Sequence, residues 1–337
     1  MLIFYVKGVL LFSHIKKVFF FFLLALFCVG CQHGKNAREQ FHSWLEENGK
    51  IKVLCTTVFV GELVRAVGGD EVDVLVLIPP RSDPHSYQLV KGDDEKFRRS
   101  DIIFSSGLGL EHRGALARYL SEKRAFALTG ELEKDEIIMH GKIKDPHVWL
   151  DLSLWAKGVD VIVKTLVEKR KEERDNFLKR GEKLKESLRS QHKKIRSLLQ
   201  RVPEKRRYLV TTHNAFHYFT RAYLATQEER DSGKWNHRCI APEGLSPEGQ
   251  INTRDLNAVV EYVLDHKTRA VFAEFGMSRD SIEKVVDAAR SRGHNVTIAK
   301  KELYSDSVES SAEIIYQSIV ERNARVIVEA LIEGDIE

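Results

Sequence analysis

A long helix-forming segment in the middle of the chain limits the possible folds more than any other feature. The residues from Leu150 to Arg201 include no proline, and apolar residues recur among them at steps of seven and four. That spacing places one apolar stripe along a helix, with lysine, arginine and glutamate on the other faces. The stripe consists of Phe177, Leu184, Leu188, Ile195 and Leu199. We expect Val202-Pro203 to end this helix.

On both sides of this segment, short apolar and β-branched runs alternate with helical patterns. Before it, the composition predicts strands at 51–58, 72–78 and 101–105, and a helix at 61–67. After it, strands are predicted at 208–212, 270–274 and 295–299, and helices at 257–264, 281–290 and 312–333. This alternation is typical of βαβ units with parallel sheets. The predicted fold class is therefore α/β, with two Rossmann-like lobes joined by one long helix.

The same patterns suggest where the parts of the chain begin and end. We predict a signal peptide at 1–30, a tether at 31–49, an N-terminal α/β lobe at 50–171, a linking helix at 172–203 and a C-terminal α/β lobe at 204–337. Ligands of open α/β sheets bind beyond the carboxyl ends of the strands. Two facing lobes would therefore hold a ligand in the cleft between them.

The N-terminal residues have the pattern of an export signal. Lys16-Lys17 precedes twelve apolar residues, Val18–Val29, which are followed by Gly30 and Cys31. A basic end, a short apolar run and a small residue before the break are typical of a secretory signal peptide. Twelve helical residues rise about 18 Å, which is less than the hydrocarbon core of about 30 Å. An uncleaved anchor that includes Leu2–Phe12 is the alternative.

The four cysteines bear on anchoring and on redox chemistry. Val29-Gly30-Cys31 resembles a bacterial lipoprotein cleavage box, in which Cys31 becomes the lipid-bearing first residue, although Cys28 stands where leucine is usual. Any contact with a membrane would then be through the signal peptide or a lipid. Cys55 and Cys239 remain in the body of the chain, where they either form a disulfide or stay apart, with Cys55 as a buried thiol.

Charge argues against nucleic acid as a partner. The net charge is +4, and residues 171–207 hold 14 Lys and Arg against six Asp and Glu. A basic excess confined to one amphipathic helix is typical of a solvated helix face. The rest of the chain has no basic patch of the kind that binds nucleic acid.

The tripeptide Asp-Pro-His occurs twice, at 83–85 and at 145–147. In each copy proline holds the preceding Asp in an extended conformation, which stiffens the loop that carries His85 or His147. A stiff loop favours metal ligation, because less entropy is lost on ordering the imidazole. The alternative is that one of these histidines only caps or packs.

Two further positions complete a possible ligand set. His213 follows the strand predicted at 208–212, with His217 four residues later, and Asp306 lies in a loop after the last predicted strand. A structural histidine and a helix-capping aspartate are the alternatives. Three imidazoles and one carboxylate would suit Zn²⁺, Mn²⁺ or Fe²⁺, and would disfavour Ca²⁺ and Mg²⁺, which prefer oxygen ligands.

These motifs together resemble those of the TroA-like family, the metal-binding solute-binding proteins of ABC importers. The resemblance covers residues 50–335 and lies in segments 79–87, 145–151, 213–219 and 303–307. It implies that His85, His147, His213 and Asp306 ligate one divalent iron, manganese or zinc ion as the transported ligand. It also implies a periplasmic, monomeric carrier that is not an enzyme. Its partners would be an ABC permease and its ATPase.

Two details bear on the choice of metal, and two depart from the family pattern. His213 stands where manganese carriers often have Glu, and residues 121–144 lack the histidine-rich loop of dedicated zinc carriers, with His140 as their only histidine. Family members with this arrangement from intracellular bacteria are associated with iron. Ser-Val-Glu follows Asp306 in place of Leu-Gly, which makes Glu309 an alternative ligand. The polar segment 228–246 has no explanation in the sequence.

Two other functions were weighed against the carrier. Three histidines with an open position would also suit a zinc hydrolase, in which Glu274 would be the general base. A carboxylate at the end of a strand is better explained as a partner that orients a ligating imidazole. A secondary role as a surface adhesin stays open, because adhesion leaves no recognisable residue pattern.

Overall fold

The computed structural model describes residues 37–111, 114–246, 252–309 and 316–333. The predicted signal peptide and Cys31 lie outside these residues. The chain divides into two compact units, Met1–Ser43 and Trp44–Glu337. Among the described helices, none is both long and apolar enough to cross a membrane.

The predicted tether is partly helical. Helix α2 spans Ala37–Leu45. Trp44 near its end is buried, and its Nε1 donates a hydrogen bond to the carbonyl oxygen of Asp73 at 2.9 Å. The second compact unit therefore begins at an anchored tryptophan, six residues before the start that the composition suggested.

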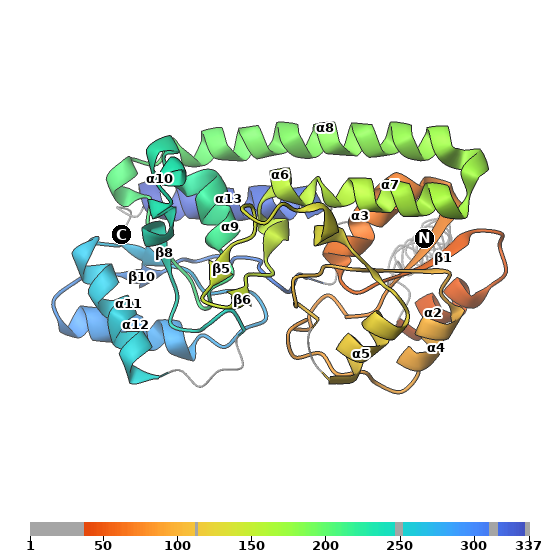
Figure 1. The fold of residues 1–337 in the computed structure, drawn as a ribbon. Coiled ribbons are helices and arrows are strands. Elements are labelled where there is room, and N and C mark those ends of the chain that lie inside the picture. The colour runs from red at the N-terminus through yellow and green to blue at the C-terminus, as the bar shows by residue number, and fades with distance from the viewer. Residues whose placement is uncertain (1–36, 112–113, 247–251, 310–315, 334–337) are drawn as a thin grey trace, which may run out of the picture. The chain divides into compact units, whose positions relative to one another are not determined.

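The N-terminal lobe is built on a parallel sheet, as predicted (Figure 1). Its strands, β1 (Ile51–Cys55), β2 (Val72–Val76), β3 (Ile102–Ser105) and β4 (Phe126–Ala127), lie in the order β2-β1-β3-β4. The strand predicted at 51–58 ends early because Thr57 begins a helix: its side chain accepts a hydrogen bond from the Val60 N–H at 3.4 Å.

The C-terminal lobe has shorter strands in the same parallel arrangement. They are β7 (Leu209–Val210), β8 (Cys239–Ile240), β9 (Ala270–Val271) and β10 (Thr297–Ile298), and they form the pairs β7–β8 and β9–β10. A parallel bridge between Thr211 and Phe272 joins the two pairs. A small antiparallel hairpin, β5 (Met139–His140) and β6 (Ile143–Lys144), was not predicted from the sequence.

Helices cover the sheets and connect the lobes. Those before the linking helix are α3 (Val58–Gly68), α4 (Asp93–Arg99), α5 (Gly114–Glu122), α6 (Leu152–Trp155) and α7 (Gly158–Lys169). Those after it are α9 (His217–Phe219), α10 (Gln227–Asp231), α11 (Thr253–Asp265), α12 (Asp280–Ser291) and α13 (Tyr316–Glu333). Residues 312–315 of the predicted last helix lie outside the described ranges.

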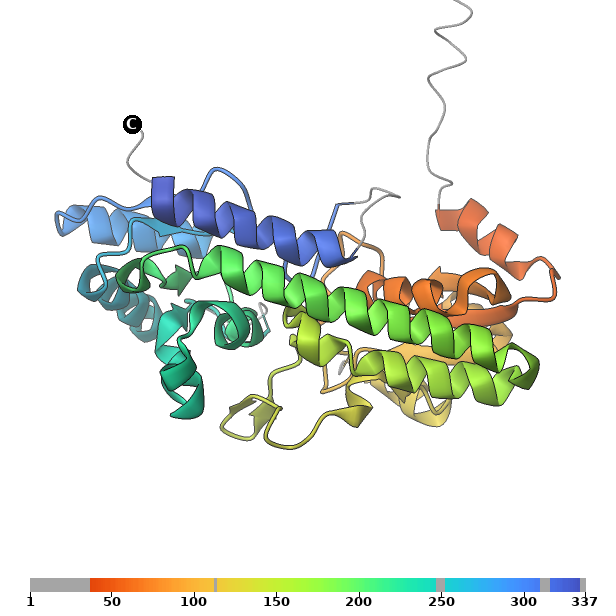
Figure 2. The ribbon, with the colours of Figure 1, turned by 90° about the horizontal axis from the view of Figure 1, so that it is seen from above.

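The linking helix α8 spans Arg174–Leu199 and runs along both lobes (Figures 1 and 2). Its predicted apolar stripe packs against α3, α7 and α13, and four of its five residues are buried, with Leu184 packed at the edge of the core. Gly181 lets α7 come close, because a Cβ there would lie 2.5 Å from Val163 Cγ2. One continuous helix thus shares a core with both lobes.

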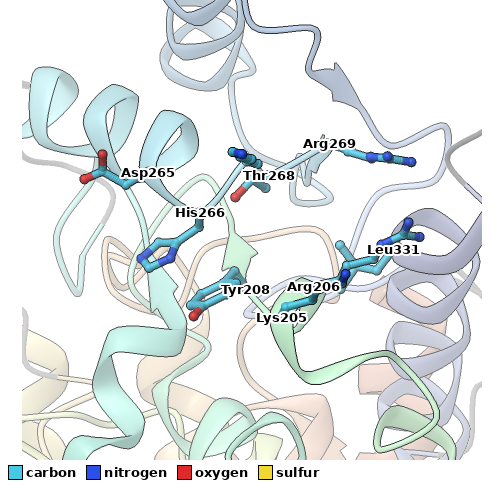
Figure 3. Close-up of a pocket in the computed structure, with 9 residues that line it drawn as sticks. Lys205, Arg206, Tyr208, Asp265, His266, Thr268, Arg269 and Leu331 are labelled. Carbon is cyan, nitrogen blue, oxygen red and sulfur yellow. The ribbon is translucent and has the colours of Figure 1, made fainter.

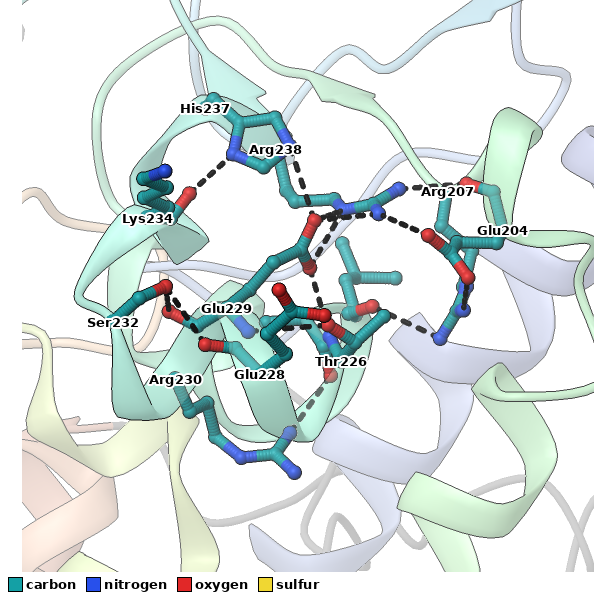
Figure 4. A network of polar contacts seen from close by, with 12 residues as sticks. Glu204, Arg207, Thr226, Glu228, Glu229, Arg230, Ser232, Lys234, His237 and Arg238 are labelled. Atoms are coloured by element: carbon teal, nitrogen blue, oxygen red, sulfur yellow. Dashed lines mark hydrogen bonds and ion pairs between the residues drawn. The ribbon is translucent and has the colours of Figure 1, made fainter.

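The polar segment 228–246, which the sequence left unexplained, is held together by hydrogen bonds and ion pairs around Arg238. Arg238 is buried and forms an ion pair with Glu229 at 2.6 Å, while it also donates to the carbonyl oxygen of Glu204 at 2.6 Å (Figure 4). Glu229 and Thr226 form a capping box at the start of α10. The charges of this segment therefore stabilise the C-terminal lobe.

The disulfide alternative is wrong for this structure. Cys55 lies in β1 and Cys239 in β8, strands of different lobes, and both are free thiols. Burial raises the pKa of each thiol to about 12. Both cysteines are therefore neutral and unreactive at physiological pH.

Candidate metal centre

The two Asp-Pro-His motifs adopt the same local structure. In the first, the side chain of Asp83 accepts a hydrogen bond from the backbone N–H of His85 at 2.8 Å. In the second, Asp145 Oδ1 accepts from the backbone N–H of His147 at 3.0 Å. Both are Asx turns, in which a side chain replaces a backbone acceptor. The repeated tripeptide therefore holds each histidine on a closed, rigid turn.

Asp145 also orients the ring of His147. Its Oδ1 accepts a hydrogen bond from Nδ1 at 2.8 Å. Because a carboxylate can only accept, Nδ1 carries the proton and Nε2 is left with its lone pair. The second motif thus presents Nε2 of His147 as a free ligand atom.

His213 is fixed by Glu274 from the neighbouring strand region. Glu274 Oε1 accepts from the His213 backbone N–H at 2.9 Å, and Oε2 lies 2.8 Å from Nδ1. Parallel bridges pair His213 with Glu243 and Glu274 with Leu303, just beyond β7 and β9. The carboxyl ends of these strands therefore bring the histidine and its carboxylate partner together.

Asp306 reaches the same place from a loop that touches the other lobe. The carbonyl oxygen of Ser305 accepts from Trp149 Nε1 at 3.0 Å. The Val308 N–H donates to the carbonyl oxygen of Pro80 at 2.9 Å. These bonds hold Asp306 buried among the histidines, whereas Glu309, the alternative ligand, is exposed and is not part of the cluster.

The four side chains converge on one small volume. Asp306 Oδ2 lies 3.0 Å from Nε2 of His213 and 3.6 Å from Nε2 of His85, and its Oδ1 lies 3.5 Å from Nε2 of His147. The Nε2 atoms of His85 and His147 are 3.2 Å apart. Ligands about 2.1 Å from a tetrahedral zinc ion are about 3.4 Å from each other. The spacing matches four donors around one transition-metal ion.

Burial and charge act in opposite directions on the titrating groups of the cluster. Burial favours the neutral form of Asp306, but the three surrounding histidines outweigh it and hold the pKa of this carboxyl well below its usual range. Burial alone would lower the pKa of His213, but the charges of Glu274 and Asp306 raise it well above its usual value. The cluster therefore favours positive charge between its carboxylates, which a metal ion supplies.

Two of the donor atoms have no hydrogen bond among the described residues to satisfy them. His213 Nε2 and Asp306 Oδ1 are buried and make no hydrogen bond within the described part of the chain. Buried polar atoms rarely stay unsatisfied in native proteins. Three imidazole nitrogens and a carboxylate are donors that suit first-row transition metals, so the residues fit such an ion.

Sequence reasoning missed a second group of metal-ligating side chains beside the first. His140, Asp145 and His217 each offer a ligand atom within 4.8 Å of the others. Asp145 was noted only as part of its motif, and His217 only as a neighbour of His213. The signal in the sequence was weak, because His140 lies in a hairpin that no periodicity predicts.

A pocket lies elsewhere in the C-terminal lobe, away from the four convergent side chains. It has a volume of about 460 Å³, and Tyr208, His266 and Arg269 are among the residues that line it (Figure 3). None of the four convergent side chains borders it. A site for a bare ion needs no such volume, because its ligands close around it.

Two α/β lobes on one long helix, with three histidines and an aspartate buried between them, define a metal-binding solute-binding protein of an ABC importer. The family model for the zinc-uptake complex component A, periplasmic (ZnuA), matches residues 53–330, and the chain belongs to this family. The resemblance seen in the sequence is thereby confirmed. The chain is the substrate-binding component of a metal import system, and family membership implies an ABC permease and ATPase as partners.

Individual relatives bear this out. The metal-binding protein YtgA of Chlamydia pneumoniae is 40% identical over 274 residues, 78% of this chain and 82% of that protein. The manganese-binding lipoprotein MntA of Bacillus subtilis is 32% identical over 263 residues, 77% of this chain and 82% of that protein. The crystal structure of Fe(III)-bound YtgA from Chlamydia trachomatis superposes with a TM-score of 0.79 at 36% identity, and covers 84% of this chain and 98% of that one.

Proposed function

We propose that His85, His147, His213 and Asp306 are the ligands of the transported ion. The observation that carries this proposal is the convergence of four donor atoms from both lobes, at separations of 3.0–3.6 Å. Two ligands come from each lobe, so the ion joins the lobes when it binds. Asp145 and Glu274 orient two of the imidazoles from behind.

The cargo in this proposal is one iron, manganese or zinc ion, and iron has the best support. The donor set excludes the alkaline-earth ions. One relative was crystallised with Fe(III), another is named for manganese, and the family description names zinc. The relative with bound iron is also 36% identical to this chain. Because ligand type alone does not choose among these ions, supply outside the cell contributes to the choice.

The carrier in this proposal acts without catalysis. Four protein ligands would fill the tetrahedral shell of zinc and leave no position for the metal-bound water that a hydrolytic zinc site requires. Glu274, the candidate general base, is buried and occupied by His213 through both carboxylate oxygens. Its position fits an orienting role and does not fit proton transfer to a substrate.

Export and anchoring complete the proposal. We place the mature protein in the periplasm as a monomer, held at a membrane by a lipid on Cys31. The pattern Val29-Gly30-Cys31 and the lipoprotein name of the Bacillus relative support the anchor. The ion would pass from this protein to the permease when the lobes separate.

Metal analysis of two double variants tests the ligand assignment. The protein with His85→Ala and His147→Ala should lose the bound ion, because half of the donors are gone. The matched control, His42→Ala with His237→Ala, removes two exposed histidines and should keep one ion per chain. Equal metal content in the two purified proteins, measured by mass spectrometry after dialysis, would refute the assignment.

A further inference from the structure

The cluster of His140, Asp145 and His217 lies directly behind the first histidine cluster. His140 belongs to the β5–β6 hairpin, Asp145 follows that hairpin, and His217 begins α9. The rings of His140 and His217 are 4.3 Å apart between centroids. The hairpin, which the sequence did not predict, thus joins the segments of His147 and His213, and two imidazoles meet one carboxylate.

The two imidazoles face the same oxygen of Asp145. Oδ2 lies 3.4 Å from His140 Nε2 and 3.2 Å from His217 Nδ1. The other oxygen, Oδ1, is occupied by His147. Donors about 2.1 Å from one ion lie about 3.0–3.4 Å apart in octahedral or tetrahedral geometry. The distances at Oδ2 fall in that range.

The donor atoms are available to an ion. His140 Nε2 makes no hydrogen bond within the described ranges, and His217 Nδ1 lies 3.1 Å from the carbonyl oxygen of Asn214 in addition to its contact with Asp145. A tautomer with the proton on Nε2 of His217 would free Nδ1 for a metal. Asp145 is fully buried, which keeps water from competing at its oxygen.

Solvent also reaches the cluster, at His140. The side chain of His140 is 34% exposed, whereas that of Asp145 is 0% exposed. His140 is carried by a two-stranded hairpin in which Met139 and Ile143 are exposed as well. An arriving ion would therefore meet His140 first and the carboxylate second.

We propose that His140, Asp145 and His217 form a second binding site for a first-row transition metal, at the solvent-facing edge of the buried cluster. Two histidines and one carboxylate leave coordination positions for water, as in open mononuclear metal sites. The site has three protein ligands and one is half-exposed, so its ion is held more weakly than the cargo. Asp145 touches both sites, through Oδ1 to His147 and through Oδ2 to the second ion.

The two sites share Asp145 but differ in their other ligands, so variants of those other ligands test each site by itself. We would load the metal-free protein with Co²⁺ by equilibrium dialysis at pH 8 and count the ions per chain. The wild-type protein should hold two, His140→Ala one, the variant with both His213→Ala and Asp306→Ala one, and the variant with all three changes none. The control His42→Ala, which removes an exposed histidine far along the chain from either cluster, should hold two.

The order of release gives a second measure. Added chelator should remove the ion that depends on His140 before the ion that depends on His213. One Co²⁺ per chain in the wild-type protein, or two in His140→Ala, would overturn the second site. An unchanged count in the variant with His213→Ala and Asp306→Ala, together with a loss of one ion in His140→Ala, would support the second site and count against the cargo site alone. Urea unfolding of each variant checks that its fold is intact.

Discussion

At the scale of single residues, two carboxylates outside the proposed ligand set orient its histidines. Asp145 fixes the proton of His147 on Nδ1, and Glu274 holds His213 by its backbone and its ring. Each carboxylate makes its histidine a better electron donor and holds the ring in place. The same negative charge also makes a proton a stronger competitor for the imidazole.

This competition predicts how Glu274→Gln changes metal binding with pH. The pKa of His213 is raised in the metal-free protein, so a proton must leave before an ion binds, and affinity should fall as the pH falls. At pH 8 the variant should bind about 10–100-fold more weakly, because the ring loses its carboxylate partner. The difference in metal affinity between the wild-type protein and the variant should become smaller toward pH 6. The reason is that Glu274→Gln removes a charge that raises the pKa of His213, so protons compete less with the metal in the variant.

Chelator competition at three pH values measures both effects. Glu283→Gln is the matched control, since Glu283 is exposed on α12, and it should follow the wild-type protein throughout. If Glu274→Gln binds metal as tightly as the wild-type protein at pH 8, or if the difference between their affinities grows as the pH falls, Glu274 does not act through His213.

At the scale of secondary-structure elements, buried charge organises the segment around α10. Arg238 is almost fully buried and contacts both Glu229 and Glu204 (Figure 4). Its guanidinium also lies 5.0 Å from the centre of the Tyr208 ring. One arginine therefore joins α10, the turn before β7 and β7 itself into one unit.

Removal of Arg238 should lower the free energy of unfolding more than removal of an exposed arginine. Arg238→Ala leaves the carboxylate of Glu229 without its partner, and we expect a loss of about 3 kcal/mol in the free energy of unfolding. The control Arg292→Ala breaks an exposed pair with Glu261, which water screens, and should lower the free energy of unfolding far less. Urea denaturation measures both, and equal losses would contradict a structural role for the Arg238 network.

At the scale of the whole two-lobe unit, a few contacts beside the proposed metal site join the two lobes. Trp149 donates to Ser305, Val308 donates to Pro80, and the Ser307 hydroxyl donates to the carbonyl oxygen of Ser82 at 3.2 Å. Helix α8 packs against α3 and α7 of one lobe and against α13 of the other. A single helix resists the bending that a loop hinge permits, so release of the ion should open the cleft only modestly.

Zn²⁺ binding should therefore change tryptophan fluorescence while the radius of gyration stays nearly constant. Trp149 is the reporter, because its indole bonds to the loop of Asp306 and lies 5.3 Å from the His147 ring. Trp149→Phe should abolish the response, and Trp235→Phe should keep it. A large change in solution scattering between metal-free and metal-bound protein would contradict a stiff linking helix.

Much of the fold could be predicted because the spacing of apolar residues within each segment indicates its secondary structure. The apolar stripe of α8, the strands on either side and the parallel sheets all depend on patterns within short windows. Each predicted strand contains an observed one, although the C-terminal strands are only two residues long with bridges beyond them. The β5–β6 hairpin was missed because tertiary contacts stabilise so short an element, whereas α10 was missed although the capping box of Thr226 and Glu229 marks its start.

The sequence by itself determined which residues were candidates for the site, since the doubled Asp-Pro-His motif and the histidine and aspartate after predicted strands mark positions where rigid loops carry donors. Only the tertiary structure decided which atoms meet. It placed Asp306 in the cluster and Glu309 outside, kept Cys55 and Cys239 apart, and assembled His140, Asp145 and His217. The physical reason is that local patterns fix the conformation of a segment, whereas the contacts between distant segments follow from how the two lobes pack along α8.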